Sequence, residues 1–207
     1  MNLQQSVYSQ FKQPHGFLGK LAGHIMANRP SNIERNVWGL ETVHLKSTDR
    51  FLEIGYGPGL AIQAALRSIT QGQVVGIDHS DEMFKQASLR NADAIESGRA
   101  KLIVGCAEDF SPEEGLFDHI FSANVVQFWD DPVKTFAHLK SLLSKNGVIT
   151  TLYMPRNKGA TSQDTEIMRE KIYQWLHSAD IEKIYHNIRE FSGLNAICVS
   201  ATNNSQN

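Results

Sequence analysis

Short apolar runs alternate with helical stripes from about residue 50 to the end of the chain. The runs are rich in β-branched residues and predict strands over 50–55, 73–78, 101–105, 117–122 and 147–154. Between them, apolar residues recur at three- and four-residue spacing, which predicts helices. Two such stripes are Ile62, Ala65, Leu66 and Ile69, and Val133, Phe136, Leu139 and Leu143. This alternation is typical of a parallel sheet with helices on both faces.

The same pattern suggests how some elements begin and how the sheet ends. Ser80 is a predicted N-cap, because Asp81 and Glu82 follow it in the first turn, where negative charge suits the helix dipole. After residue 160, one more helix is predicted from Ile167, Met168, Lys171, Ile172, Trp175 and Leu176. Two strands, 182–191 and 195–202, then follow and are joined through Ser192-Gly193. We expect this hairpin to close the sheet with an antiparallel edge.

The region before the first strand is predicted to be helical and separate. Ser31-Asn32-Ile33-Glu34 fits a capping box. The face expected to pack inward carries Ile33, Val37, Leu40 and His44. Upstream, 14–26 is apolar but interrupted by glycine, so it is either a mobile lid over a pocket or a terminal helix packed on the sheet. We therefore predict a cap over 1–47, one domain over 48–202 and a frayed tail over 203–207.

Composition narrows the range of partners. The chain has 207 residues and a formal net charge of −2, and no basic run suggests a nucleic-acid footprint. It has neither a stretch of about 20 apolar residues for a membrane span nor a signal peptide pattern, so we expect a cytoplasmic location. Cys106 and Cys198 are distant in sequence and are predicted to be small buried side chains. Asp130-Asp131-Pro132 is expected to start a helix, and no metal site is predicted.

The segment 51–60, Phe-Leu-Glu-Ile-Gly-Tyr-Gly-Pro-Gly-Leu, carries the main chemical signal. Alternating glycines let a ligand lie against the main chain where a strand passes into a helix. The pattern is G-x-G-x-G with Glu53 upstream, whereas a dinucleotide fingerprint is G-x-G-x-x-G. This spacing favours S-adenosylmethionine. Asp78 ends the next strand and is placed to accept hydrogen bonds from a ribose diol, which fits a nicotinamide cofactor equally well.

Three later segments support a resemblance to a known family. They are Leu102-Ile103-Val104-Gly105-Cys106-Ala107-Glu108-Asp109-Phe110, the run 117–129 from Phe117 to Trp129, and Leu142-Leu143-Ser144-Lys145-Asn146-Gly147-Val148-Ile149-Thr150. In this order they resemble the class I, seven-strand S-adenosylmethionine-dependent methyltransferases of type 11, and the amino-terminal pattern is similar to the quinone C-methyltransferase branch. The resemblance implies an α/β, Rossmann-like, doubly wound sheet, mostly parallel with an antiparallel last strand, helices on both faces and an amino-terminal helical lid.

The resemblance also implies a set of site residues. Those expected at the cofactor are Glu53, Gly55, Tyr56, Gly57, Gly59, Asp78, His79, Met83, Cys106, Ala107, Glu108, Asn124 and Val125. Tyr56 is expected to face the methionine or the acceptor, and Met83 to pack beside adenine. Cys106 stands where the family commonly has an acidic residue for the adenine amino group, so we expect backbone groups near Ala107 and the Glu108 side chain to recognise adenine. Residues expected at the acceptor are His15, Phe17, His24, Phe128 and Trp129.

The sequence therefore predicts a methyltransferase that acts on a small-molecule acceptor by in-line displacement. It names no catalytic base, methylated atom or oligomeric state. Two alternatives remain open. One is a domain that binds S-adenosylmethionine without catalysis, and the other is a nicotinamide oxidoreductase, against which Leu60 argues because a third fingerprint glycine is missing.

Overall fold

The computed structural model describes residues 30–111, 115–157 and 159–202. In chain order the elements are α3 (Pro30–Glu41), β1 (Arg50–Ile54), α4 (Leu60–Ser68), β2 (Gln73–Asp78), α5 (Asp81–Arg90), α6 (Ala92–Glu96), β3 (Ala100–Val104), a 3-10 turn (Ala107–Asp109), β4 (Phe117–Ala123), a 3-10 turn (Val126–Phe128), α7 (Pro132–Ser141), β5 (Leu143–Tyr153), α8 (Ser162–Ser178), β6 (Lys183–Phe191) and β7 (Leu194–Thr202). Strands and helices alternate as the sequence predicts.

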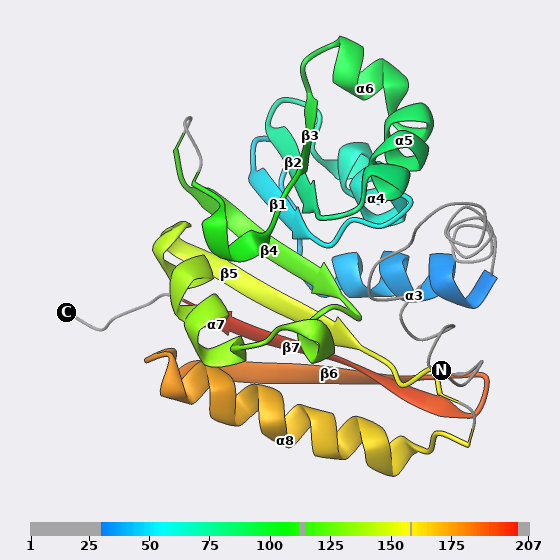
Figure 1. Cartoon of the computed structure of the whole chain (residues 1–207), viewed down its shortest axis with the longest axis vertical. Helices are drawn as coiled ribbons and strands as arrows, with labels where there is room; N and C mark the ends of the chain where they lie inside the picture. The colour runs from blue at the N-terminus through cyan, green and yellow to red at the C-terminus, as the bar shows by residue number, and fades with distance from the viewer. Residues whose placement is uncertain (1–29, 112–114, 158, 203–207) are drawn as a thin grey trace.

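Seven strands form one sheet in the order β3-β2-β1-β4-β5-β7-β6. Figure 1 shows β3 with α5 and α6 at one end of the sheet and β6 with α8 at the other. The strands β1 to β5 pair in parallel, and β7 runs antiparallel between β5 and β6. The predicted fold class is confirmed, with one refinement: the antiparallel strand β7 lies inside the sheet, and β6 forms its edge.

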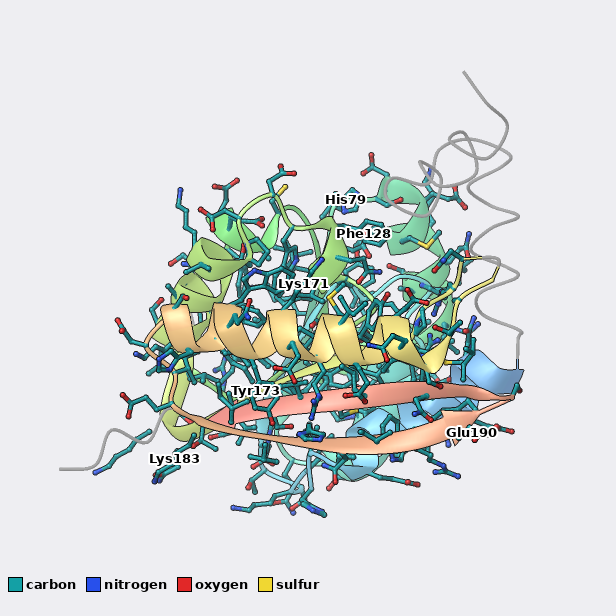
Figure 2. All side chains as sticks on the ribbon, turned by 90° about the horizontal axis from the view of Figure 1, so that it is seen from below. His79, Phe128, Lys171, Tyr173, Lys183 and Glu190 are labelled. Carbon is teal, nitrogen blue, oxygen red and sulfur yellow. The ribbon has the colours of Figure 1, made fainter. Side chains whose placement is uncertain are left out.

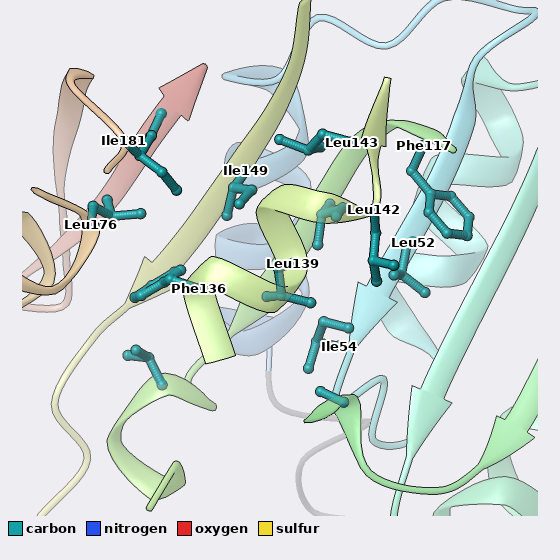
Figure 3. Close-up of a cluster of buried hydrophobic side chains, with 14 of the residues drawn as sticks. Leu52, Ile54, Phe117, Phe136, Leu139, Leu142, Leu143, Ile149, Leu176 and Ile181 are labelled. Carbon is teal, nitrogen blue, oxygen red and sulfur yellow. The ribbon is translucent and has the colours of Figure 1, made fainter. Parts of the chain in front are cut away.

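Two apolar layers cover the sheet, one on each face. One layer joins the strands to α3, α4 and α5 and includes Phe51, Ile62 and Phe121. The other layer joins the strands to α7 and α8. Figure 3 labels ten of its members, which come from strands, helices and the turns that follow α7 and α8: Leu52, Ile54, Phe117, Phe136, Leu139, Leu142, Leu143, Ile149, Leu176 and Ile181. Neighbouring strand residues point to opposite faces, so Phe51 and Leu52 belong to different layers.

Local sequence signals explain several element ends. The Ser80 hydroxyl accepts a hydrogen bond from the Met83 N–H at 3.3 Å, which confirms the predicted N-cap of α5. Asp131 caps α7 in the same way, with Pro132 in its first turn. The β6–β7 turn, Ser192-Gly193, has positive φ at both residues (52° and 83°), the geometry of a two-residue hairpin.

The structure corrects the predicted ends of two elements. The helix α3 already includes Pro30 and Ser31, so Ser31 does not precede it as a cap. The strand β5 begins at Leu143, which belongs to the strand and not to the α7 stripe. Its pairing with β4 shifts between Phe117 and His119, and Asn146 has φ +74°. Asn-Gly therefore forms a bulge inside a longer strand.

The buried face of α3 agrees with the prediction only in part, because Leu40 is buried whereas His44 lies beyond the helix and is exposed. Ile33 is 43% exposed, whereas Asn32, Arg35 and Asn36 are buried. Gly39 lies on the buried side, and a Cβ there would stand 2.6 Å from Leu152 Cδ1 and 3.0 Å from Phe121 Cζ. The helix therefore lies close against β4 and β5. In the part of the chain that the structure describes, no helix is long and apolar enough to cross a membrane.

Candidate functional site at the carboxyl edge of the sheet

The glycine loop connects β1 to α4 at the carboxyl edge of the parallel strands. Gly55, Gly57 and Gly59 have φ of +70°, +50° and +78°, a region that side-chain-bearing residues rarely adopt. A Cβ at Gly55 would stand 2.5 Å from Val125 Cγ2, and one at Gly59 would stand 2.7 Å from Asn91 Nδ2. Gly57 has no heavy atom within 4 Å of that position. The loop is thus packed at both ends and open at its centre.

Hydrogen bonds from outside the loop hold it in place. Gly55 N donates to Ile77 O at 2.7 Å, and Arg90 Nε donates to Pro58 O at 2.9 Å. Because these bonds come from β2 and α5, the loop is supported by two other elements. We call this loop, residues 55–59, the rim of the sheet edge.

Two buried carboxylates lie under this rim. Glu53 is 2% exposed and accepts from the Ile62 N–H, while its Oε2 has no hydrogen-bond partner among the described residues. Asp78 is 7% exposed, and its two oxygens accept from Gly57 N and Ser80 N, each at 2.9 Å. Burial raises the pKa of Glu53 well above its usual range, and the nearby Asp78 raises it further. Burial also raises the pKa of Asp78, against its two backbone hydrogen bonds.

The Tyr56 side chain is buried between β2 and β3. It is 2% exposed, packs against the position of Gly76 on β2 and donates its hydroxyl to Ile103 O at 3.3 Å. Burial raises the pKa of this phenol. The ring thus packs against β2 and reaches β3 near its carboxyl end, and its contact with the methionine or the acceptor stays a prediction.

The neighbouring strand ends carry the residues expected near adenine. His79 is 43% exposed, with Nδ1 3.9 Å from Asp78 Oδ1. Met83 is 2% exposed and packs in the core behind it. After β3, Cys106 is exposed, which corrects the prediction of a buried thiol, whereas Cys198 is buried as predicted. Ala107 is buried, and the Glu108 side chain accepts from Thr135 Oγ1 at 3.1 Å.

The end of β4 is joined to the end of β5 by one side chain. Asn124 has φ +55°, its Nδ2 donates to Met154 O at 2.6 Å, and Met154 N donates to its Oδ1 at 3.1 Å. The Asn124 main chain is engaged as well, because its N–H donates to Leu152 O at 2.8 Å and its carbonyl accepts from Gln127 Nε2 at 2.8 Å. Val125, the next residue, contacts Gly55 of the loop.

The two aromatic residues after β4, Phe128 and Trp129, lie in different surroundings. Trp129 packs edge-on against Phe136 of α7, with ring centroids 5.1 Å apart, so much of it lies under that helix. Phe128 is partly buried at the end of the 3-10 turn. Figure 2 labels His79 and Phe128, and both lie above α8 in that view. His15, Phe17 and His24 fall outside the described residues.

A polar group from α3 reaches this edge, and the sequence pattern gave no sign of it. Arg35 Nη1 lies 3.9 Å from Met154 Sδ, and Arg156 Nη2 donates to Asn32 Oδ1 at 3.3 Å. The helix before β1 is thus fastened to the end of β5. Three of its polar residues, Asn32, Arg35 and Asn36, are buried together with Trp38 and Leu40.

Comparison with known proteins agrees with this geometry. Residues 52–151 match the model of the methyltransferase domain family of type 11. An uncharacterised methyltransferase, YdaC of Bacillus subtilis, is 26% identical over 87% of this chain and 97% of its own length. The crystal structure of an S-adenosylmethionine-dependent methyltransferase from Aquifex aeolicus has the same fold, with a TM-score of 0.70 and 19% identity over 85% of this chain and 94% of that one. Residues 52–151 form a methyltransferase domain of type 11, and the chain has the fold of the class I S-adenosylmethionine-dependent methyltransferases.

A further relative of this methyltransferase covers only part of it. The trans-aconitate 2-methyltransferase of Escherichia coli is 29% identical over 57% of this chain and 44% of its own length. The family assignment favours S-adenosylmethionine over the nicotinamide cofactor that the glycine loop alone left open.

The residues of this methyltransferase fit S-adenosylmethionine on three structural observations. Glu53 Oε2 is a buried acceptor without a partner among the described residues, as an ammonium group requires. Gly57 leaves open space at the rim where a side chain would stand. Asp78 is a carboxylate at the end of β2, within one strand of the loop. These features match a ligand with a cationic amine and vicinal hydroxyls.

Proposed function

We propose that this methyltransferase transfers a methyl group from S-adenosylmethionine to a small-molecule acceptor. The observation that carries the proposal is the attachment of α3 to the end of β5, beside Asn124. A helix of the same chain thereby lies beside the carboxyl ends of β4 and β5, next to the strand that leads into the glycine loop. The connection from β5 to α8 spans only 154–161, which leaves little room for a further substrate domain.

We assign the cofactor contacts by position. Glu53 binds the methionine ammonium, Asp78 binds the ribose diol, and the main chain of 55–59 lies against the cofactor. The residues assigned to the adenine side are His79, Met83, Cys106, Ala107 and Glu108, and those assigned to the methionine side are Asn124 and Val125. Phe128 supplies apolar wall for the acceptor, together with the exposed part of Trp129. His15, Phe17 and His24 stay predictions.

The sulfonium of S-adenosylmethionine supplies the electrophilic methyl group. The protein's task is then to hold an acceptor in line with it, and positioning of this kind can lower the barrier by about 7–11 kcal/mol. The packed ends of the loop and the Asn124 link between β4 and β5 fix the walls against which an acceptor is held. An acceptor that is nucleophilic as bound requires no base from the protein.

The test is a calorimetric titration with S-adenosylhomocysteine followed by a transfer assay with methyl-labelled S-adenosylmethionine. We expect saturable binding, and label transferred into small molecules of a cell extract rather than into protein or nucleic acid. Absence of binding would refute the cofactor site. Binding with label found only in macromolecules would refute the small-molecule acceptor, and binding without any transfer would favour the non-catalytic alternative.

A further inference from the structure

The buried face of α3 carries a cation for which the described structure provides no anion. Arg35 is 3% exposed, and its contact at hydrogen-bond range is Met154 Sδ, at 3.9 Å. A thioether is a weak acceptor. The Nε of Arg35 is buried without a hydrogen-bond partner among the described residues. The guanidinium is therefore removed from water with little to replace it.

The ionisable groups that act on Arg35 do not compensate its charge. They are Arg156, which is also cationic, and the Cys198 thiol, whose pKa burial raises to about 12. Burial and Arg156 both lower the pKa of Arg35. The 29 residues that precede α3 contain neither aspartate nor glutamate. Two guanidinium groups thus stand near each other at the end of β5.

A buried unpaired cation is costly to a folded protein. The desolvation penalty amounts to several kcal/mol for an ion without a partner, and an apolar side chain of similar volume at such a position is often neutral or stabilising. An anion bound from solution would offset this penalty. Carboxylate and phosphate groups suit a guanidinium best, because its planar fork donates two parallel hydrogen bonds to them.

The position of Arg35 connects it to the cofactor edge. It contacts Met154, whose backbone is held on both sides by the Asn124 amide. The residue after Asn124 is Val125, which contacts Gly55 of the loop. One chain of contacts therefore links the buried guanidinium to the rim where the methyl donor binds.

We propose that Arg35, with Arg156 beside it, binds a carboxylate or phosphate group of a small molecule held at this edge. The inference rests on the proposed function, because donor and acceptor are the molecules that would meet there. Two sources can supply the oxyanion: the methionine carboxylate of the cofactor, or an anionic group of the acceptor. The recognition chemistry is the same for both.

The experiment compares the wild-type protein with Arg35→Met, which keeps volume and removes charge, and with Arg67→Met, which removes an exposed charge from α4. Binding of S-adenosylhomocysteine and of 5′-methylthioadenosine, which lacks the amino-acid carboxylate, is measured by calorimetry. Thermal unfolding of the S-adenosylhomocysteine-saturated proteins is then followed with inorganic phosphate or malonate at constant ionic strength.

If Arg35 binds the cofactor carboxylate, Arg35→Met weakens S-adenosylhomocysteine binding by about tenfold or more and leaves 5′-methylthioadenosine binding unchanged. If it binds an acceptor oxyanion, S-adenosylhomocysteine binding is unchanged, and the rise in melting temperature with phosphate or malonate is lost. In both cases Arg67→Met behaves as wild type, and ligand-free Arg35→Met melts no lower than wild type.

The inference is overturned if Arg35→Met matches wild type in its response to S-adenosylhomocysteine, 5′-methylthioadenosine, phosphate and malonate. It is also overturned if the only effect of Arg35→Met is a lower melting temperature, as a purely structural role requires. A different result bears on the proposed function instead. If wild-type protein binds neither S-adenosylhomocysteine nor 5′-methylthioadenosine, the cofactor site fails, whatever Arg35 does with phosphate or malonate.

Discussion

Asp78 has a structural role in the fold, to which our proposal adds the binding of the ribose diol. Its oxygens accept from Gly57 N and Ser80 N, so it fixes the loop and the start of α5 before any ribose is bound. We expect Asp78→Asn to weaken S-adenosylhomocysteine binding about 10- to 100-fold. Hydrogen bonds to a charged group contribute about 1.5–3 kcal/mol, and the asparagine has no charge. In addition, its amide NH₂ group must face one of the two backbone donors, Gly57 N or Ser80 N, where the carboxylate has an acceptor oxygen. Calorimetry measures the change.

The control for this prediction is Asp93→Asn, which neutralises an exposed carboxylate on α6. Its affinity should equal that of wild type. An unchanged affinity in Asp78→Asn itself would remove Asp78 from the site.

Glu53 should make the ligand-free protein less stable as the pH rises. Its folded pKa lies above the ordinary value of 4.5, so the folded state holds the proton more tightly than the unfolded chain. Its favourable contribution is complete below that ordinary value and is lost as pH rises toward the raised pKa. We expect Glu53→Gln to unfold at higher urea concentration than wild type at neutral pH and at a similar concentration in acid.

Urea unfolding across the pH range measures this difference, and Glu96→Gln on the exposed face of α6 is the control. A gap between Glu53→Gln and wild type that stays constant with pH would show that protonation of Glu53 is not its cause.

At the scale of residues, some positions of the candidate site could be predicted from the sequence and others could not. The acidic and glycine positions of the loop were predicted because their spacing is local. The burial of Arg35 was not predicted, since it depends on a contact 119 positions away in sequence, Met154. Hydropathy assigns arginine to the surface, so no pattern within α3 could have revealed it.

At the scale of elements, the glycine loop and the turn after β4 are fitted to each other. We expect Gly55→Ala to cost about 1–2 kcal/mol through its positive φ and about 1–3 kcal/mol more through contact with Val125. Gly98→Ala is a matched control, because φ there is +74° and no atom lies within 4 Å of the new Cβ. Urea unfolding gives both costs.

The double variant Gly55→Ala/Val125→Ala should recover the contact part of that cost and leave the backbone part. If Gly55→Ala is no more costly than Gly98→Ala, the loop and the turn are not in the tight contact described.

The elements themselves were predictable to different degrees. The range 73–78 matches β2, because a β-branched run bounded by a turn and a carboxylate leaves few alternatives. The start of β5 was missed because Leu143-Ser144-Lys145 continues the α7 stripe in sequence, and only pairing with Phe117 draws it into the sheet. The short α6 has no amphipathic stripe long enough to detect.

At the scale of the whole molecule, the two apolar layers share one sheet and should unfold together. The three tryptophans report on both: Trp38 lies in the layer of α3, and Trp129 and Trp175 pack on the other. We expect Trp38→Phe and the double variant Trp129→Phe/Trp175→Phe each to show one urea transition, with the fluorescence midpoint equal to the circular dichroism midpoint of the same protein. Separate fluorescence and dichroism midpoints in either variant would mean that one layer melts on its own.

Gly39 lets α3 approach the sheet closely because it has no Cβ, and this close approach also affects Arg35, one helical turn earlier. Arg35 and Gly39 are four residues apart and so share a face. A methyl group at 39 would act as a wedge against Leu152 and Phe121, tilting the helix and lifting the guanidinium away from Met154. The absence of a Cβ at position 39 thus determines how deeply the guanidinium of Arg35 is buried.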